Sequence, residues 1–221
     1  MPKKVFRIFF FITILLITVS CRNDGYDAGE GKYSNLYSDF GDITTKTGGQ
    51  LNAFYRDDDL KLTFDASSAI PEAKADTTYR ALLHYKPVGD RTISLVGLEP
   101  VMVIRPFVPT PNTYYKHDPV ELISAWKSKN GQYINLALGL KVGQSDTDNK
   151  KHILGAMLQR EYGMTNSYYI TLLHDQNGVP ENYTTTVYVS FPLKGLFVSG
   201  DKVRIAVYIG GGYQLKDFVV P

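Results

Sequence analysis

Four histidines and a single cysteine are the side chains in this 221-residue sequence that could hold a transition metal or act as a strong nucleophile. Zinc sites need such ligands at short, regular spacings, as in the H-E-x-x-H motif of a helix. No two histidines have that spacing, and most of them fall within or at the end of predicted strands, where surface or edge positions are expected. The sequence therefore predicts neither a metal site nor a cofactor. The four histidines are His84, His117, His152 and His174.

A run of three aspartates, Asp57 to Asp59, could suggest a calcium site. Calcium loops of the EF-hand type place acidic residues at alternate positions, followed by glycine and a later glutamate. The run lacks that pattern and lies between two strand-like segments, residues 51–55 and 60–64. The second segment alternates apolar and polar residues, which is typical of a half-buried strand. We therefore expect an acidic turn in a β-hairpin.

Motifs of nucleotide binding and nucleophilic catalysis are missing from the sequence. It contains no G-x-S-x-G, P-loop or G-x-G-x-x-G pattern, and the glycines at 210–212 precede no predicted helix. Serine, histidine and aspartate side chains from distant positions can still assemble in space, which leaves a hydrolase open as an alternative. The prediction from the motifs is a protein that is not an enzyme.

Tyrosine is abundant, with 16 residues, and exposed aromatic rings could stack on sugars. Tyrosine is also common on the faces and edges of ordinary sheets. We interpret these side chains as sheet residues and keep a glycan-binding surface as the alternative. The tyrosines concerned are Tyr114, Tyr115, Tyr162, Tyr168, Tyr169 and Tyr183.

The cysteine, Cys21, follows an uncharged apolar segment, residues 8–19, which is itself preceded by three basic residues. A helix of that length spans about 18 Å, short of a bilayer core of about 30 Å, and is typical of a signal peptide. The ending Ser20-Cys21 resembles the lipobox of bacterial lipoproteins, although Thr18 stands where leucine is usual. We predict cleavage between Ser20 and Cys21 and lipid on Cys21 as a membrane anchor. Ordinary secretory cleavage, leaving a free thiol, is the alternative.

Removal of the leader changes the net charge. The whole sequence has 24 basic and 22 acidic residues, and residues 1–20 hold three of the basic ones and no acidic one. The remaining chain has a net charge of about −1, which gives no global attraction to nucleic acid or anionic lipid. Arg22 stands in place of aspartate after the cysteine, and analogy with lipoprotein sorting then predicts the outer membrane, with the leaflet left open.

Composition divides the chain into four predicted parts. Residues 1–20 form the signal peptide, and residues 21–32, rich in glycine and charge, form a flexible tether. Strand-like segments separated by turns fill residues 33–112 and again 113–221, with four prolines between 106 and 119 at the boundary. Apolar residues at helical spacing are scarce. The pattern therefore predicts an all-β fold with a β-sandwich in the second half.

Two segments leave the type of element open. Residues 66–77 could hold a short helix or a long loop. Residues 121–126 could form a short helix or a strand, and Trp126 within them is expected in a hydrophobic core.

Several segments, in their order along the chain, resemble the NigD-like lipoproteins of Bacteroidetes. The resemblance implies an OB-fold-like small barrel at residues 33–112 and an antiparallel β-sandwich at residues 113–221, and it implies no catalytic residues. The family takes its name from a bacteriocin gene cluster, for which an immunity role is proposed. The segments are RDDDL at 56–60, YRALLHY at 79–85, GQYINL at 131–136, KHI at 151–153, LLHD at 172–175 and VSFPL at 189–193.

The functional hypothesis that follows is a non-enzymatic lipoprotein of the cell envelope that binds a protein partner, in the manner of bacteriocin immunity. A glycan-binding accessory lipoprotein and a fimbrial-type subunit are the alternatives, since small barrels and sandwiches both serve such functions. The only membrane contact expected is the lipid on Cys21, and no nucleic-acid partner is expected.

Overall fold

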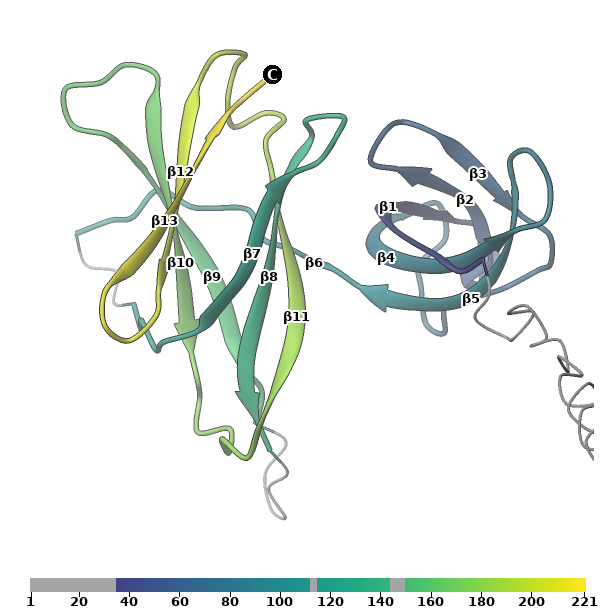
Figure 1. Ribbon diagram of the computed structural model, residues 1–221, viewed down its shortest axis with the longest axis horizontal. Helices are drawn as coiled ribbons and strands as arrows, with labels where there is room; N and C mark the ends of the chain where they lie inside the picture. The colour runs from purple at the N-terminus through teal and green to yellow at the C-terminus, as the bar shows by residue number, and fades with distance from the viewer. Residues whose placement is uncertain (1–34, 112–114, 144–149) are drawn as a thin grey trace, which may run out of the picture. The chain divides into compact units, whose positions relative to one another are not determined.

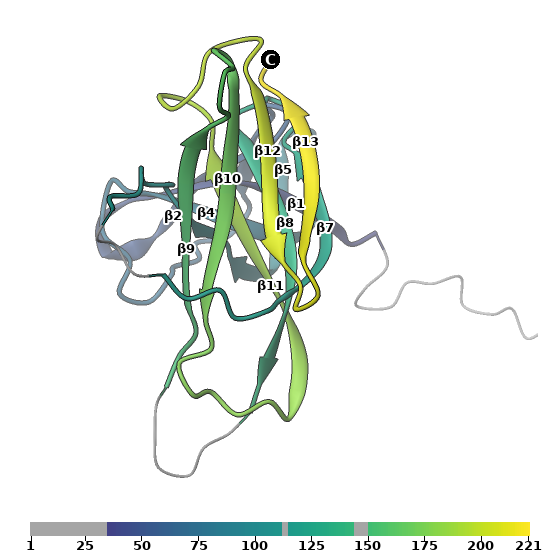
Figure 2. The ribbon, with the colours of Figure 1, turned by 90° about the vertical axis from the view of Figure 1, so that its left-hand side faces the viewer.

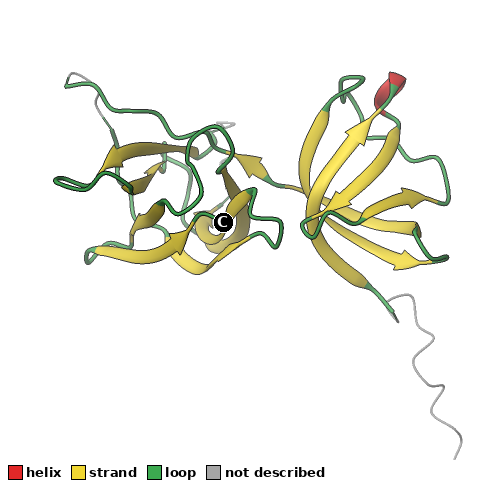
Figure 3. Ribbon diagram, turned by 90° about the horizontal axis from the view of Figure 1, so that it is seen from above, coloured by secondary structure: helices red, strands yellow, loops and turns green. Residues whose placement is uncertain are grey.

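The computed structural model describes residues 35–111, 115–143 and 150–221. The predicted signal peptide, Ser20, Cys21, the tether and Tyr114 lie outside the described residues, so those predictions stay predictions. Within the described ranges the chain consists of strands and one short 3-10 turn, η1 (Thr47–Gly49), which confirms the predicted all-β class (Figure 3). No helix in these ranges is long and apolar enough to cross a membrane.

The first five strands close into a small barrel (Figure 1). Around the barrel the order is β1-β2-β3-β5-β4; β1 pairs antiparallel with both β2 and β4, and β3 pairs parallel with β5. The predicted small barrel is thus confirmed. Its strands are β1 (Tyr37–Thr45), β2 (Leu51–Arg56), β3 (Lys61–Phe64), β4 (Thr78–Pro87) and β5 (Thr92–Pro100).

The barrel interior is filled by the alternate side chains that the strand period points inward. Phe54 of β2 is fully buried there, and its ring lies across β1 at Gly41, where an added Cβ atom would come within 2.5 Å of the ring. Glycine at this position therefore makes room for the Phe54 ring. The buried core comprises Ile43, Phe54, Leu62, Ala81, Leu83, Tyr85 and Ile93.

Two four-stranded sheets follow, in the orders β13-β12-β10-β9 and β6-β11-β8-β7 (Figure 1). Most neighbours are antiparallel, while β10 with β12 and β6 with β11 run parallel. The strands are β6 (Met102–Val103), β7 (Glu121–Lys127), β8 (Tyr133–Val142), β9 (Ile153–Arg160), β10 (Ser167–Asp175), β11 (Tyr183–Pro192), β12 (Lys202–Tyr208) and β13 (Tyr213–Val219).

The two sheets share one hydrophobic core. Ile134, Leu136, Leu138 and Leu140 of β8 are all buried in it, as their alternation in the sequence predicts. Inward residues of β10, β11 and β12 complete the core, among them Ile170, Phe191 and Ile205, each fully buried.

The segment before β7 crosses from one sheet to the other (Figure 2). The Asp118 N–H donates to the His174 carbonyl at the end of β10, and the Val120 N–H donates to the Tyr208 carbonyl at the end of β12. The prolines that predicted an interruption of the sheet lie in this segment, and its described part contributes only isolated bridges.

Several sequence expectations differ from the structure in detail. Residues 66–77 form a loop, residues 121–126 lie in strand β7, and the strand expected at residues 100–105 shortens to the two residues of β6. Trp126 is half-buried and packs edge-on against Phe40 of the barrel at 5.1 Å, outside the sandwich core. β6 pairs with β11 of the sandwich although β6 lies before residue 113, where the sequence places the start of the second domain. That domain boundary stays a prediction.

Candidate functional site

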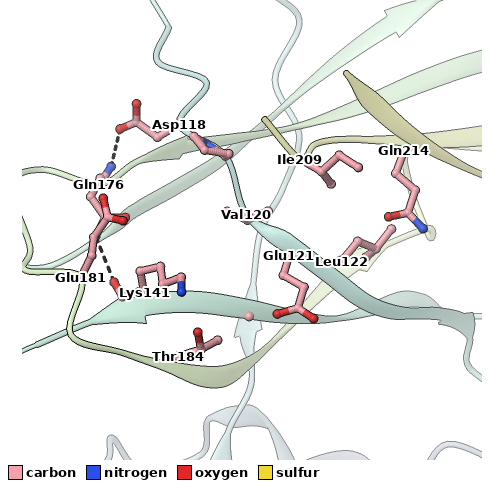
Figure 4. Close-up of a pocket in the computed structure, with 12 residues that line it drawn as sticks. Asp118, Val120, Glu121, Leu122, Lys141, Gln176, Glu181, Thr184, Ile209 and Gln214 are labelled. Carbon is pink, nitrogen blue, oxygen red and sulfur yellow. Dashed lines mark hydrogen bonds between the residues drawn. The ribbon is translucent and has the colours of Figure 1, made fainter. Parts of the chain in front are cut away.

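A groove of about 470 Å³ opens at one end of the sandwich (Figure 4). The start of β7, the end of β8 and the start of β11 form one side of it. The loop after β10 and the β12–β13 hairpin form the other. Its lining residues are Asp118, Pro119, Val120, Glu121, Leu122, Gly139, Lys141, Gln176, Glu181, Thr184, Ile209 and Gln214.

The loops around the groove are held together by Gln176. Its backbone N–H donates to Asp118 Oδ2 at 2.7 Å, and its Nε2 donates to the Lys141 and Val179 carbonyls at 2.9 Å each. These bonds tie the segment before β7, the end of β8 and the loop after β10 to one residue. The wall of the groove is therefore fixed before any ligand arrives.

Charged side chains of both signs project into the groove without a partner among the described residues. Glu121, Lys141 and Glu181 are exposed, and Figure 4 shows them on the strands and loop that surround it. The Glu121 carboxylate crosses Gly139, where an added Cβ would lie 2.7 Å from Oε2, and Thr184 lies beside the same glycine. Glycine at 139 thus lets the carboxylate lie flat on the sheet.

This arrangement is suited to reversible binding by ion pairs and hydrogen bonds. Carboxylates, one ammonium group, one hydroxyl and two carboxamides line a half-open space, so a ligand with charges of both signs meets a complementary partner for each. No histidine lines the groove, and its single hydroxyl, on Thr184, has no base against it within the described residues. No group of three or more metal-ligating side chains occurs in the described ranges.

Two of the four histidines, His174, which is buried, and His152, which is half-buried, form a hydrogen-bonded pair beside Asp118 of the groove. His174 Nδ1 donates to the Asp118 carbonyl at 3.1 Å, so its Nε2 accepts the proton of His152 Nδ1 at 2.9 Å. His152 Nε2 is buried and has no partner among the described residues. Burial, together with the nearby imidazole of His174, lowers the pKa of His152. The expectation of a surface or edge position is wrong for His174, which is only 2% exposed.

The other two histidines are more accessible. On the barrel, His84 makes two hydrogen bonds: its Nδ1 lies 2.7 Å from Ser38 Oγ, and its Nε2 lies 2.9 Å from Glu99 Oε1. His117 Nδ1 lies 3.2 Å from the Tyr213 hydroxyl. Neither is brought into the groove.

Arg80 joins the barrel to the sandwich through a buried polar network. Its guanidinium makes a two-pronged ion pair with Asp57, at 2.5 and 2.7 Å, and lies 3.4 Å from Asp42. Toward the sandwich, it donates to Asn135 Oδ1 at 3.1 Å and Ser190 Oγ at 3.3 Å. The Arg80 side chain is 1% exposed, so these partners replace water completely.

Aromatic rings and acids complete the surroundings of this guanidinium. It stacks over Tyr133 at 4.2 Å and lies 5.9 Å from the Phe40 ring. Burial raises the pKa of Asp42, and the Arg80 guanidinium acts against that rise. The acid run therefore forms the predicted turn, and its first residue, Asp57, has an unforeseen role as the counter-ion of a buried arginine.

The second residue of the acid run has a surface partner. Asp58 accepts two hydrogen bonds from Arg56, at 2.8 and 2.5 Å. This pairing lowers the pKa of Asp58 to about 2.

The tyrosines singled out for sugar stacking do not share one surface. Tyr115 contacts Phe107 and His117. Tyr168 packs on Phe197, and the Tyr169 hydroxyl accepts from Arg204. Tyr162 and Tyr183 are well exposed.

The groove residues carried no signal in the sequence that could have found them. Glu121, Lys141, Glu181 and Gln214 come from four separate elements, and each alone is an ordinary polar surface residue. The one local clue was Gly139, a glycine inside an otherwise regular strand, which often marks a close approach.

Comparison with known proteins finds a family match for the sandwich. Residues 104–210 match the family described as the NigD-like C-terminal beta sandwich domain. Over these residues the chain is similar to that family. The resemblance to this family predicted from the sequence is thereby confirmed, and the groove lies within this domain apart from its last lining residue, Gln214. Among proteins with curated descriptions, none matches the chain.

Solved structures with the same fold include proteins from Bacteroides and Parabacteroides species. A NigD-like immunity protein from Bacteroides caccae superposes with a TM-score of 0.64 and 24% identity, covering 86% of this chain and 100% of its own. A protein described as toxin-related from Parabacteroides distasonis gives 0.64 and 15%, over 83% and 92% of the two chains. A candidate lipoprotein from Bacteroides fragilis gives 0.64 and 11%, over 84% and 98%. At these identities the likenesses show the fold alone.

Proposed function

We propose that this NigD-like chain is a non-enzymatic lipoprotein of the cell envelope that binds a protein partner through the groove at the end of its sandwich. The observation that carries the proposal is the set of exposed charges, Glu121, Lys141 and Glu181, which have no partner among the described residues, on a wall fixed by Gln176. Rigid polar grooves give binding specificity through charge complementarity, without any catalysed reaction.

The solved relatives support the direction of this proposal. One is described as an immunity protein and another as a candidate lipoprotein. Reversible binding of another protein is the kind of interaction that the groove suits. We also propose that the barrel is of the OB-like type and that the anchor is lipid on Cys21 in the outer membrane.

The anchor has a direct test. Cells expressing wild-type protein and Cys21→Ala are fed labelled palmitate and then fractionated. The wild type should take up label and stay with outer membranes, whereas Cys21→Ala should lose both properties. A Cys21→Ala protein that remains labelled and membrane-bound would contradict the anchor.

The partner role is tested by deleting the gene and challenging cells with a panel of bacteriocins. Deletion should raise sensitivity to at least one of them, and the wild-type gene should restore resistance. Lys141→Glu and Glu121→Lys should fail to restore it at equal protein level. Glu72→Gln, an exposed change on a barrel loop, serves as the matched control. Unchanged sensitivity of the deletion strain throughout would remove the immunity form of the proposal.

A row of aromatic side chains favours glycan binding as a second candidate. Phe107, Tyr115, His117 and Tyr213 follow one another at ring separations of 5.9 to 6.4 Å, and Phe107 and Tyr213 are exposed. Successive aromatic rings can stack on successive sugars. Thermal shift against a panel of polysaccharides, repeated with Tyr213→Ala, separates the two functions. A shift that Tyr213→Ala abolishes would favour the glycan.

A further inference from the structure

Part of strand β11 presents an unpaired backbone edge. Leu193 N–H donates to the Gln132 carbonyl on the β8 side, whereas the Ser190 carbonyl accepts from Ile104 on the opposite side. The N–H and C=O of one strand residue point the same way and alternate along the chain. The backbone groups of residues 184, 186 and 188 therefore face away from β8, where no described residue pairs with them.

The other sheet edges in the described residues are all blunted. A bulge between Leu122 and Ser124 distorts β7, and Phe107 pairs with the edge of β9. On β13, Lys216 lies in the strand, and Lys127 Nζ donates to the Val219 carbonyl. Bulges, covering segments and lysines are the usual means of preventing strand addition.

Residues 184–188 of β11 carry none of these devices. Their sequence is Thr-Thr-Thr-Val-Tyr, with no charge, proline or glycine, and the register with β8 is unbroken. Such a β-branched run is well suited to pair with another strand.

The same edge already accepts a strand next to this run. β6 pairs in parallel with Val189 and Ser190 and stops after two residues. The open part of the β11 edge is thus continuous with the part that β6 already occupies. Phe40 of the barrel packs on Tyr188 at 5.2 Å and limits the space at that end. A single extended segment needs about 5 Å beside the strand. A second copy of the chain would have to place its own β6 and barrel there as well.

We propose that residues 184–188 of β11 receive an extended segment of the protein partner, which adds to the sheet as a strand beside the groove. The inference rests on the proposed function and names the form in which the partner is bound. Thr184 belongs to both the groove and the edge, so the two surfaces are continuous.

The side chains of β11 specify the character of the bound segment. Thr185 and Val187 are half-buried at the margin of the sandwich core, while Thr184 and Thr186 are exposed on the other face. The segment should be uncharged over about five residues. Its side chains should be apolar opposite Thr185 and Val187 and should carry hydroxyl groups opposite Thr184 and Thr186.

The test uses the full-length lipoprotein in detergent as bait for a phage library of linear peptides of about twelve residues, long enough for one strand. Peptides enriched on the wild type are synthesised, and their affinities are measured by fluorescence anisotropy. Thr186→Pro removes an N–H that faces the open edge, a position where proline is tolerated in sheets. Leu215→Pro is the control, because it removes an outward-facing backbone N–H from the edge strand β13. The bond from Lys127 Nζ to the Val219 carbonyl shows that the backbone groups of odd-numbered β13 residues face away from β12. If Thr186→Pro does not fold by circular dichroism, Thr184→Pro takes its place.

Enriched peptides should show the alternating uncharged pattern and lose at least about tenfold in affinity on Thr186→Pro, because a hydrogen bond is lost and the ring obstructs the next one. Leu215→Pro should bind as the wild type does. Failure to enrich any peptide, or equal binding to Thr186→Pro, would overturn the strand addition. A dimer that Thr186→Pro dissociates would also overturn it, by assigning the edge to a second copy. Peptides lost on Lys141→Glu and retained on Thr186→Pro would leave the proposed function standing without the added strand.

Discussion

Truncation of Arg80 to alanine tests how the barrel and the sandwich are joined. The change removes the two-pronged ion pair with Asp57 and the bonds to Asn135 and Ser190 in one step. It leaves the Asp57 carboxylate, whose side chain is 13% exposed, without a cation. Asn135 is fully buried and its Nδ2 already has no partner among the described residues, so its carboxamide would depend on Ser190 alone.

The expected magnitude follows from burial. Removing one partner of a buried ion pair costs about 3–5 kcal/mol, because the other charge stays behind without water or a counter-ion. An exposed pair of the same chemistry contributes about 0–1 kcal/mol. The same hairpin supplies that comparison, since Arg56 makes a two-pronged pair with Asp58 in which both side chains are about a quarter exposed.

Urea unfolding of Arg80→Ala, Arg56→Ala and the wild type, followed by far-ultraviolet circular dichroism, measures both costs. Arg80→Ala should lower the free energy of unfolding by about 3–5 kcal/mol, and Arg56→Ala by less than about 1 kcal/mol. Burial already raises the pKa of Asp42, and loss of the guanidinium should raise it further. Because a raised folded-state pKa favours folding at low pH, the Arg80→Ala deficit should shrink in acid. Equal losses for the two alanine variants would refute the reasoning.

Three further predictions concern single residues. Gly41→Ala should destabilise the barrel by about 1–3 kcal/mol in urea unfolding, because the new methyl group meets the Phe54 ring. The pKa of Asp58 is lowered to about 2 from 3.8, so its pairing stabilises the fold above pH 3.8 and that contribution is lost as the pH falls toward 2. Carboxyl NMR titration should show this, and Arg56→Ala should return the pKa toward 3.8. The pKa of His152 lies below 6.5 in the folded state, so the unfolded chain takes up the proton first and stability should fall as the pH drops below 6.5. Urea midpoints at pH 7.5 and 5.5 should differ less in His152→Gln than in the wild type.

Local patterns in the sequence predicted many of the strands, while residues 121–126, which form β7, were left open between helix and strand. The alternation of Leu60 and Leu62 predicted β3, and that of Ile134 to Leu140 predicted β8, because a half-buried strand must alternate. The aspartate run was correctly interpreted as a turn. β6 was overestimated, since an apolar run does not reveal how far a partner strand extends.

Contacts between distant segments were beyond the same reasoning. Trp126 was expected in a core and instead lies against Phe40 of the barrel, because its strand is at the margin of its sheet. His174 was expected near the surface, yet the segment before β7 covers it. The groove depends on five segments meeting at one end of the sandwich, which no local spacing encodes.

The network around Arg80 also bears on the order in which the barrel and the sandwich fold. Strands β1 to β5 are complete by residue 100, but Ser190 lies 110 positions after Arg80. Because domains generally fold from the N-terminus onward, the barrel closes before the second half of that network is in place. Until the sandwich docks, the closed barrel holds the guanidinium against Asp57 and Asp42 with its other side in water, and docking of the later strands removes that water.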